Sequence, residues 1–180
     1  MCGLAATAGA SAATPAQAAR AAVWSLHDLT VHLNHLPKTY PCNDLWTKFH
    51  DVLLAIGARP DLTIATFRCG AGLGALAFSP EVRVHFSMLQ PASQTPDLWA
   101  DAVVAPQTVR LEPGHPGSLD ASDCELLRQM KNGLLAALPH RIVSFRLACD
   151  APPTRWPFSV SLETVTPVET DGRARLAARD

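Results

Sequence analysis

The sequence predicts an α+β protein built from a duplicated strand–helix–strand–strand unit. The first observation is a pair of similar stretches: CNDLWTKFHDVLLAIGARPDLTIATFRC runs from Cys42 to Cys69, and DCELLRQMKNGLLAALPHRIVSFRLAC runs from Asp123 to Cys149. Each has a cysteine at its start, an amphipathic helical pattern, a short break, a strand containing Phe-Arg, and a closing cysteine. The second observation is strand-like alternation of apolar and polar residues around these stretches. Two such units are expected to form one mostly antiparallel six-stranded sheet with two helices on one face.

The first unit is expected over residues 23–90. Apolar and polar residues alternate from Leu29 to Asn34, which indicates a half-buried strand. The helix that follows has apolar residues at the spacing of one buried stripe, namely Leu45, Phe49, Val52 and Leu53. Gly57 suits the C-terminal end of this helix, because glycine adopts positive φ without strain. Residues 61–69 and 82–89 then complete the unit as two strands.

The second unit is expected over residues 102–166 and begins with a strand that Pro106 interrupts. Proline cannot donate to a β-ladder, so we expect a bulge or an edge position there. Ser122 followed by Glu125 has the spacing of a capping box, so the helix should begin at Asp123. Its buried stripe should consist of Leu126, Met130, Leu134 and Leu138. Two further strands are expected over residues 141–149 and 158–165.

The remaining segments are a leader, a linker and a tail. Residues 1–22 are small, alanine-rich and nearly uncharged, and Ala10-Ser11-Ala12 fits a small-x-small signal cleavage site. No basic region precedes this stretch, and a start codon assigned too far downstream would explain that; the alternative is a disordered leader. Prolines and polar residues make 91–101 a linker, and the charged tail over 167–180 is expected to be disordered.

Cysteine usage indicates export. Cys2 lies in the leader, and the other four cysteines fall as one pair in each unit. An even count in an exported protein indicates disulfides, and the repeat selects Cys42 with Cys69 and Cys124 with Cys149. The alternatives are four reduced cysteines in a cytoplasmic protein, or zinc ligands, although zinc sites use much closer cysteine pairs. We therefore expect a periplasmic or secreted protein.

Charge and hydropathy exclude two classes of function. The chain has 180 residues and a net charge of −1. This lacks the basic field that binding to nucleic-acid phosphates needs. No apolar run approaches the roughly 18 residues of a transmembrane helix. The chain is long enough for one domain, but each unit of roughly 70 residues is marginal as a core of its own.

The predicted order of elements resembles the duplicated strand–helix–strand–strand modules of the haem-binding SOUL proteins and the GyrI-like ligand-binding proteins. The resemblance covers most of residues 23–166 and is one of topology, since no residue motif of these families is matched. It implies a binding cleft where the two modules meet. No cofactor is predicted from it.

Arg68 and Arg146 are the candidate ligand-binding residues. They occupy equivalent places, each directly after a phenylalanine. One interpretation is that both guanidinium groups bind a carboxylate or phosphate near the pseudo-twofold axis. The alternative is that each extends from the solvent face of the sheet or pairs with a nearby carboxylate.

The first strand is rich in histidine, which is a common ligand of zinc and copper. His27 and His35 would share one face of the strand, but at about 3.3 Å per residue they lie too far apart for one ion. His32 would point to the opposite face. We therefore predict no metal site here.

The functional prediction is an exported, non-enzymatic binding or assembly protein. It would hold a partner protein or a small ligand at the junction of its two units. The alternatives are a metal-binding periplasmic protein, or an enzyme whose site forms only in three dimensions. For the enzyme, His32 or His85 with Asp28 or Glu81 would supply the acid–base groups.

Overall fold

The structure is a computed structural model in which residues 20–69, 79–92, 102–138, 140–150 and 157–168 are described. The predicted leader up to residue 19, the linker from residue 93 and the tail from residue 169 lie outside these residues. Residues 20–22, which we assigned to the leader, belong to the first strand. We call residues 20–92 the first half of the chain and residues 102–168 the second half.

The described residues form one antiparallel six-stranded sheet and two α-helices, which confirms the predicted fold class. The strands are β1 (Arg20–His32), β2 (Thr63–Phe67), β3 (Glu81–Pro91), β4 (Ala102–Leu111), β5 (Arg141–Leu147) and β6 (Phe158–Pro167). The helices are α1 (Cys42–Ala55) and α2 (Cys124–Gly133), with 3₁₀ turns η2 (Ala121–Asp123) and η3 (Leu135–Ala137) on either side of α2. The strand order is β2-β3-β1-β4-β6-β5. Both halves thus follow the strand–helix–strand–strand order, while their origin by duplication stays a prediction.

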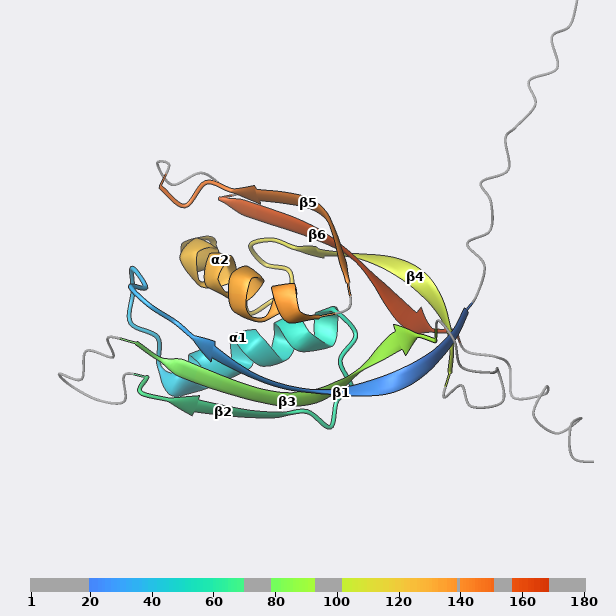
Figure 1. Ribbon diagram of the computed structural model, residues 1–180. Helices are drawn as coiled ribbons and strands as arrows, with labels where there is room; N and C mark the ends of the chain where they lie inside the picture. The colour runs from blue at the N-terminus through green and yellow to red at the C-terminus, as the bar shows by residue number, and fades with distance from the viewer. Residues whose placement is uncertain (1–19, 70–78, 93–101, 139, 151–156, 169–180) are drawn as a thin grey trace, which may run out of the picture.

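The sheet is bent at its centre, where the two halves meet. β1 pairs with β3 along nearly its whole length, but with β4 only over Arg20–Ala22. Beyond this short ladder β1 and β4 diverge, and the sheet opens into two wings, β2-β3-β1 and β4-β6-β5. Figure 1 shows both helices lying between the two wings.

One core joins both halves of the chain, because each helix turns its apolar stripe inward. The predicted stripe residues of both helices are buried, namely Leu45, Phe49, Val52 and Leu53 on α1, and Leu126, Met130, Leu134 and Leu138 along α2 and the turn after it. They belong to a single cluster with inward-facing residues of the strands. Each fully buried side chain of this kind stabilises the fold by roughly 1.5–3 kcal/mol relative to exposure.

The two helix ends differ in how well they were predicted. Gly57 follows α1 with φ of +98°, as its role at the helix end requires. The predicted capping box of Ser122 and Glu125 was wrong. The side chain of Asp120 instead accepts from the backbone N–H of Ser122 at 2.7 Å. The side chain of Asp123 accepts from the backbone N–H of Asp120 at 2.8 Å. An extra 3₁₀ turn before α2 moves the cap two residues toward the N-terminus.

Pro106 occupies an edge position, one of the two expected for it. β4 pairs with β1 only as far as Val104, so one side of Pro106 faces no strand among the described residues. On its other side Pro106 is opposite Val165 of β6, in a register that continues to Leu111. The β4–β6 register continues through Pro106 without a shift, so no bulge forms there.

Both predicted disulfides are present. Cys42 and Cys69 have Cα atoms 5.1 Å apart, and Cys124 and Cys149 have Cα atoms 5.4 Å apart. Each ties the first residue of a helix to the chain just after the next strand. Their sequence separations of 27 and 25 residues are nearly equal, so the chain-entropy estimate gives each about 3–4 kcal/mol.

Two partly buried histidines have ring nitrogens that lack a partner among the described residues, Nε2 of His27 and Nδ1 of His140. His27 stacks on Phe86 with ring centroids 5.3 Å apart. Burial lowers the pKa of both imidazoles below the ordinary value of 6.5. Both therefore resist protonation in the folded state.

We expect the protein to lose stability as the pH falls below about 6.5. In that range unfolded histidine binds a proton that folded His27 and His140 do not, so acid favours the unfolded chain. Urea unfolding between pH 7.5 and 5.5 would measure this, with His27→Phe expected to flatten the dependence. An unchanged slope in both His27→Phe and His140→Phe would contradict it.

Candidate functional site

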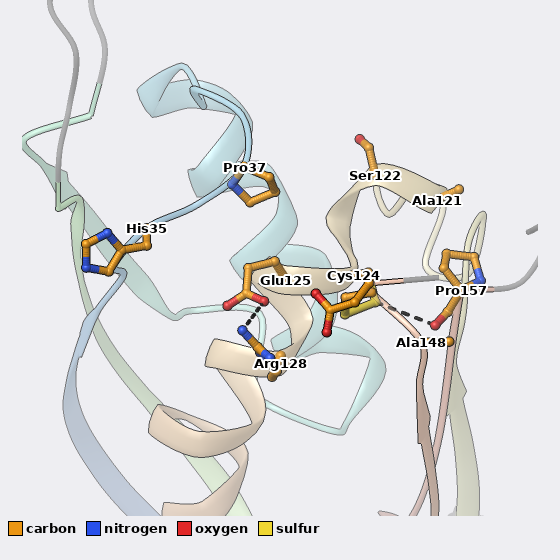
Figure 2. Close-up of a pocket in the computed structure, with 11 residues that line it drawn as sticks. His35, Pro37, Ala121, Ser122, Cys124, Glu125, Arg128, Ala148 and Pro157 are labelled. Carbon is orange, nitrogen blue, oxygen red and sulfur yellow. Dashed lines mark hydrogen bonds and ion pairs between the residues drawn. A yellow bond between two sulfur atoms is a disulfide. The ribbon is translucent and has the colours of Figure 1, made fainter. Parts of the chain in front are cut away.

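A pocket of about 600 Å³ lies where the first half of the chain meets the start of α2. The first half contributes His35 and Pro37 from the loop after β1. The second half contributes the first turns of α2 and the Cys124–Cys149 disulfide. Figure 2 shows these groups around the hollow, with Glu125 and Arg128 between His35 and Pro157.

The loop that carries His35 is clamped to α2. The backbone N–H of Asn34 donates to Oε1 of Gln129 at 2.7 Å, and Nε2 of Gln129 donates to the carbonyl of Asn34 at 2.5 Å. The next residue, His35, has φ of 52°, in the left-handed region that non-glycine residues rarely adopt. Strain of this kind costs of order 1–3 kcal/mol and gathers at binding sites. The clamp therefore holds a strained residue in the lining of the pocket.

An ion pair lies on the α2 side of the pocket. Oε2 of Glu125 is 2.6 Å from Nη2 of Arg128, and Oε1 accepts from Gln129 at 2.7 Å. The Glu125 side chain is 13% exposed, whereas that of Arg128 is 50% exposed. The negative charge of Glu125 is therefore compensated by Arg128. Glu125 also fixes the position of the guanidinium group, and the other N–H groups of Arg128 stay accessible.

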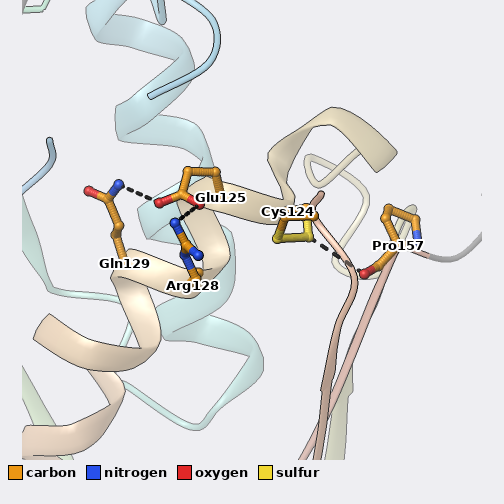
Figure 3. Close-up of a disulfide and its surroundings, with 6 residues drawn as sticks. Cys124, Glu125, Arg128, Gln129 and Pro157 are labelled. Carbon is orange, nitrogen blue, oxygen red and sulfur yellow. Dashed lines mark hydrogen bonds and ion pairs between the residues drawn. A yellow bond between two sulfur atoms is a disulfide. The ribbon is translucent and has the colours of Figure 1, made fainter. Parts of the chain in front are cut away.

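The Cys124–Cys149 disulfide forms the opposite wall. Cys124 begins α2, and Cys149 lies two residues after β5. Ala148, Asp150 and Pro157 flank the bridge and also line the pocket. Figure 3 shows the disulfide beside Pro157, with Glu125 turned toward Arg128 and Gln129.

A buried charge network at η2 joins the two halves. Its centre is Asp123, which is fully buried. The hydroxyl of Tyr40 donates to Oδ1 of Asp123 at 2.9 Å, and Nζ of Lys48 donates to Oδ2 at 2.8 Å. Lys48 also donates to the carbonyl of Ser118 at 2.6 Å. Burial and the Asp123 charge raise the pKa of Tyr40, which stays a neutral donor.

Lys48 and Asp120 keep their charges in this network. Burial alone would lower the pKa of Lys48, but its hydrogen bond and attraction to Asp123 outweigh burial and raise it. Burial likewise opposes ionisation of Asp120, yet hydrogen bonds from Ser122 and the charge of Lys38 lower its pKa to about 2. Lys38 also lies 2.9 Å from Asp123 and bonds the Ser122 hydroxyl. The network fixes η2, whose residues border the pocket.

The structure does not bring Arg68 and Arg146 together. Arg68 is exposed just after β2, with φ of 54°, and Arg146 is exposed on β5. β2 and β5 are the two edge strands of the sheet, and neither arginine lines the pocket. Their role in binding stays a prediction, and this arrangement offers no shared ligand position for them.

The histidine–carboxylate pairs considered for an enzyme do lie side by side on the outer face of the sheet. Nδ1 of His32 is 3.7 Å from Glu81, and Nδ1 of His85 is 3.9 Å from Asp28. Both distances exceed hydrogen-bond range. Three of the four side chains are more than half exposed, and no pocket residue is among them. Pairs at this separation on the solvent-facing side of a sheet contribute little interaction energy.

The pocket residues His35, Glu125, Arg128 and Asp150 were not among the site residues predicted from the sequence. A usable signal was present, because Glu125 and Asp150 directly follow the two cysteines of one predicted disulfide. A bridge between Cys124 and Cys149 must bring their neighbours together. His35 gave no such signal, because its place depends on the fold of the other half.

Within the described ranges, no group of three or more His, Cys, Asp or Glu side chains is placed to hold a metal ion. Nor does any helix there have the length and hydropathy to span a membrane. A scan of protein-family models, a search of curated proteins and a search of solved structures each found no significant match to this chain.

Proposed function

We propose that this protein is an exported binding protein that holds a small molecule in the pocket between its halves. The observation that carries the proposal is the pocket itself. Its volume of about 600 Å³ lies within the roughly 300–1,000 Å³ of small-molecule sites. Its concave shape and the strained, clamped His35 favour a small ligand over a flat protein interface.

The charges in the pocket favour a ligand with a positively charged group. Glu125 is neutralised by Arg128, so this pair adds no net charge. Asp150 is exposed and has no ion-pair partner among the described residues. A cationic group beside Asp150 would compensate its charge, while the free N–H groups of Arg128 would donate to a carbonyl or hydroxyl.

The same chemistry supports binding rather than catalysis. The two titratable side chains within hydrogen-bond reach in the pocket are Glu125 and Arg128. Arginine does not release its proton in proteins, so this pair cannot pass a proton as an acid and a base do. Export is proposed on the two disulfides, which persist in oxidising compartments, together with the signal-like leader.

Three probes of matched shape and different charge test the proposal: benzylamine, benzyl alcohol and benzoate. Ligand-observed NMR should show benzylamine binding most tightly and benzoate most weakly. Asp150→Asn should weaken benzylamine about tenfold, equivalent to about 1.4 kcal/mol, and change benzyl alcohol little. No binding of any probe to the wild type would refute the proposed function.

A variant that fills the pocket tests whether the probe binds there. Ala121 lines the pocket, and Ala136 is an exposed alanine that does not. Ala121→Trp should abolish benzylamine binding, whereas Ala136→Trp should keep it. Binding that survives in Ala121→Trp would place the probe elsewhere.

A further inference from the structure

The Cys124–Cys149 disulfide is part of the pocket wall, and its counterpart in the first half is not. Cys124 and Cys149 both line the pocket, whereas Cys42 and Cys69 do not. The two bridges otherwise hold equivalent places, from the start of a helix to the chain after the next strand. Because of this difference, the Cys124–Cys149 disulfide shapes the pocket as well as stabilising the fold.

The backbone near Cys149 depends on this bridge. The ladder between β5 and β6 ends at Leu147, opposite Phe158, and a last backbone bond joins the N–H of Ala148 to the carbonyl of Pro157 at 2.8 Å. After that bond, the disulfide is the described contact that fixes Cys149 and Asp150 to α2. Asp150, the group expected to face the ligand's charge, therefore keeps its place through the bridge beside it.

We propose that reduction of Cys124–Cys149 by a dithiol switches off ligand binding in the pocket. The inference rests on the proposed function, since it assigns a redox control to the same site. The protein would bind its ligand in an oxidising compartment and release it where dithiols are abundant.

The chemistry is thiol–disulfide exchange. A thiolate of the dithiol attacks the Cys149 sulfur from the pocket, a mixed disulfide forms, and the displaced Cys124 thiolate takes up a proton. The second thiol of the reductant, as a thiolate, then attacks the reductant's first sulfur atom, which is bonded to Cys149. This closes the reductant's disulfide and releases Cys149 as a thiolate that takes up a proton. Two electrons and two protons pass to the cysteines, and the dithiol becomes a disulfide. Freed from α2, Asp150 leaves the pocket and the wall opens.

The first test measures the order of reduction and needs no ligand. The full chain is treated with limiting dithiothreitol, alkylated at intervals and read by peptide mass spectrometry. Cys124 and Cys149 should become labelled several-fold faster than Cys42 and Cys69, because both residues of the first pair line a pocket that can admit the reductant and neither residue of the second pair does. Equal rates, or faster labelling of Cys42 and Cys69, would overturn the redox control.

The second test compares two double variants of nearly equal chain-entropy cost, Cys124→Ser with Cys149→Ser and Cys42→Ser with Cys69→Ser. Benzylamine affinity should fall at least tenfold in the first and stay within about twofold in the second, at a temperature where circular dichroism shows both folded. Equal affinities in the two variants would overturn the inference and leave the proposed function intact. Absence of binding of all three probes to the wild type would instead refute the proposed function, and the order of reduction would still be measured.

Should both variants unfold, the wild type supplies the deciding measurement. Ligand and disulfide must affect each other equally if they are coupled. Saturating benzylamine should therefore slow the reduction of Cys124–Cys149 and leave that of Cys42–Cys69 unchanged. Protection of neither bridge, in a protein that binds benzylamine, would contradict the coupling.

Discussion

Asp123→Ala is expected to lower the free energy of unfolding by about 3–5 kcal/mol, the range measured when one partner of a buried ion pair is removed. Asp123 is fully buried and accepts from Tyr40 and Lys48 while pairing with Lys38. Its loss leaves the Lys48 ammonium, 3% exposed, without its nearest counter-charge. The remaining carboxylates, Asp44 and Asp120, are farther away at 3.6 and 3.7 Å, so the Lys48 pKa should fall.

Urea unfolding monitored by circular dichroism measures the effect. Asp61→Ala is the matched surface control, because Asp61 is 63% exposed and pairs with Arg59 at 3.4 Å; it should cost at most about 1 kcal/mol. A double variant, Lys48→Met with Asp123→Leu, should be less destabilised than Asp123→Ala, because it leaves neither charge unpaired. A cost for Asp123→Ala as small as that of Asp61→Ala would show that the network adds little to stability.

The first half of the chain by itself, residues 20–92, is expected not to fold cooperatively. A chain of roughly 70 residues is marginal for one core, and here the core is shared. Without α2 and the second wing, apolar side chains on the buried face of α1 become exposed to solvent. Lys48 and Tyr40 would also lose Asp123, and Asn34 would lose Gln129.

Differential scanning calorimetry should show no sharp transition for residues 20–92, in contrast to the full chain. Mixing this fragment with residues 102–168 should restore helical circular dichroism, because the β1–β4 ladder and the shared core can form again between chains. A sharp transition for residues 20–92 alone would mean that the halves are independent domains.

The sequence by itself determined the helices, the strands and the disulfide pairing of this protein. The stripes on both helices are local patterns with a period of 3.6 residues, so Leu45, Phe49, Leu126 and Met130 could be assigned to the core without knowledge of the fold. The cysteines could be paired because each pair frames one similar stretch. The sheet class followed from the same order of elements in both halves. These features depend on residues close together in the chain.

Only the tertiary structure decided where the site lies. Asp123 meets Lys48 across a separation of 75 residues, and Asn34 meets Gln129 across 95. No local pattern marks such pairs, since each joins residues of the first half to residues of the second half. The fold places His35 in the pocket beside the start of α2, and the strand order puts Arg68 and Arg146 near opposite edges of the sheet. The two arginines occupy similar places in the sequence, but their strands, β2 and β5, are the two outermost strands of the sheet, so similar places in the chain lie far apart.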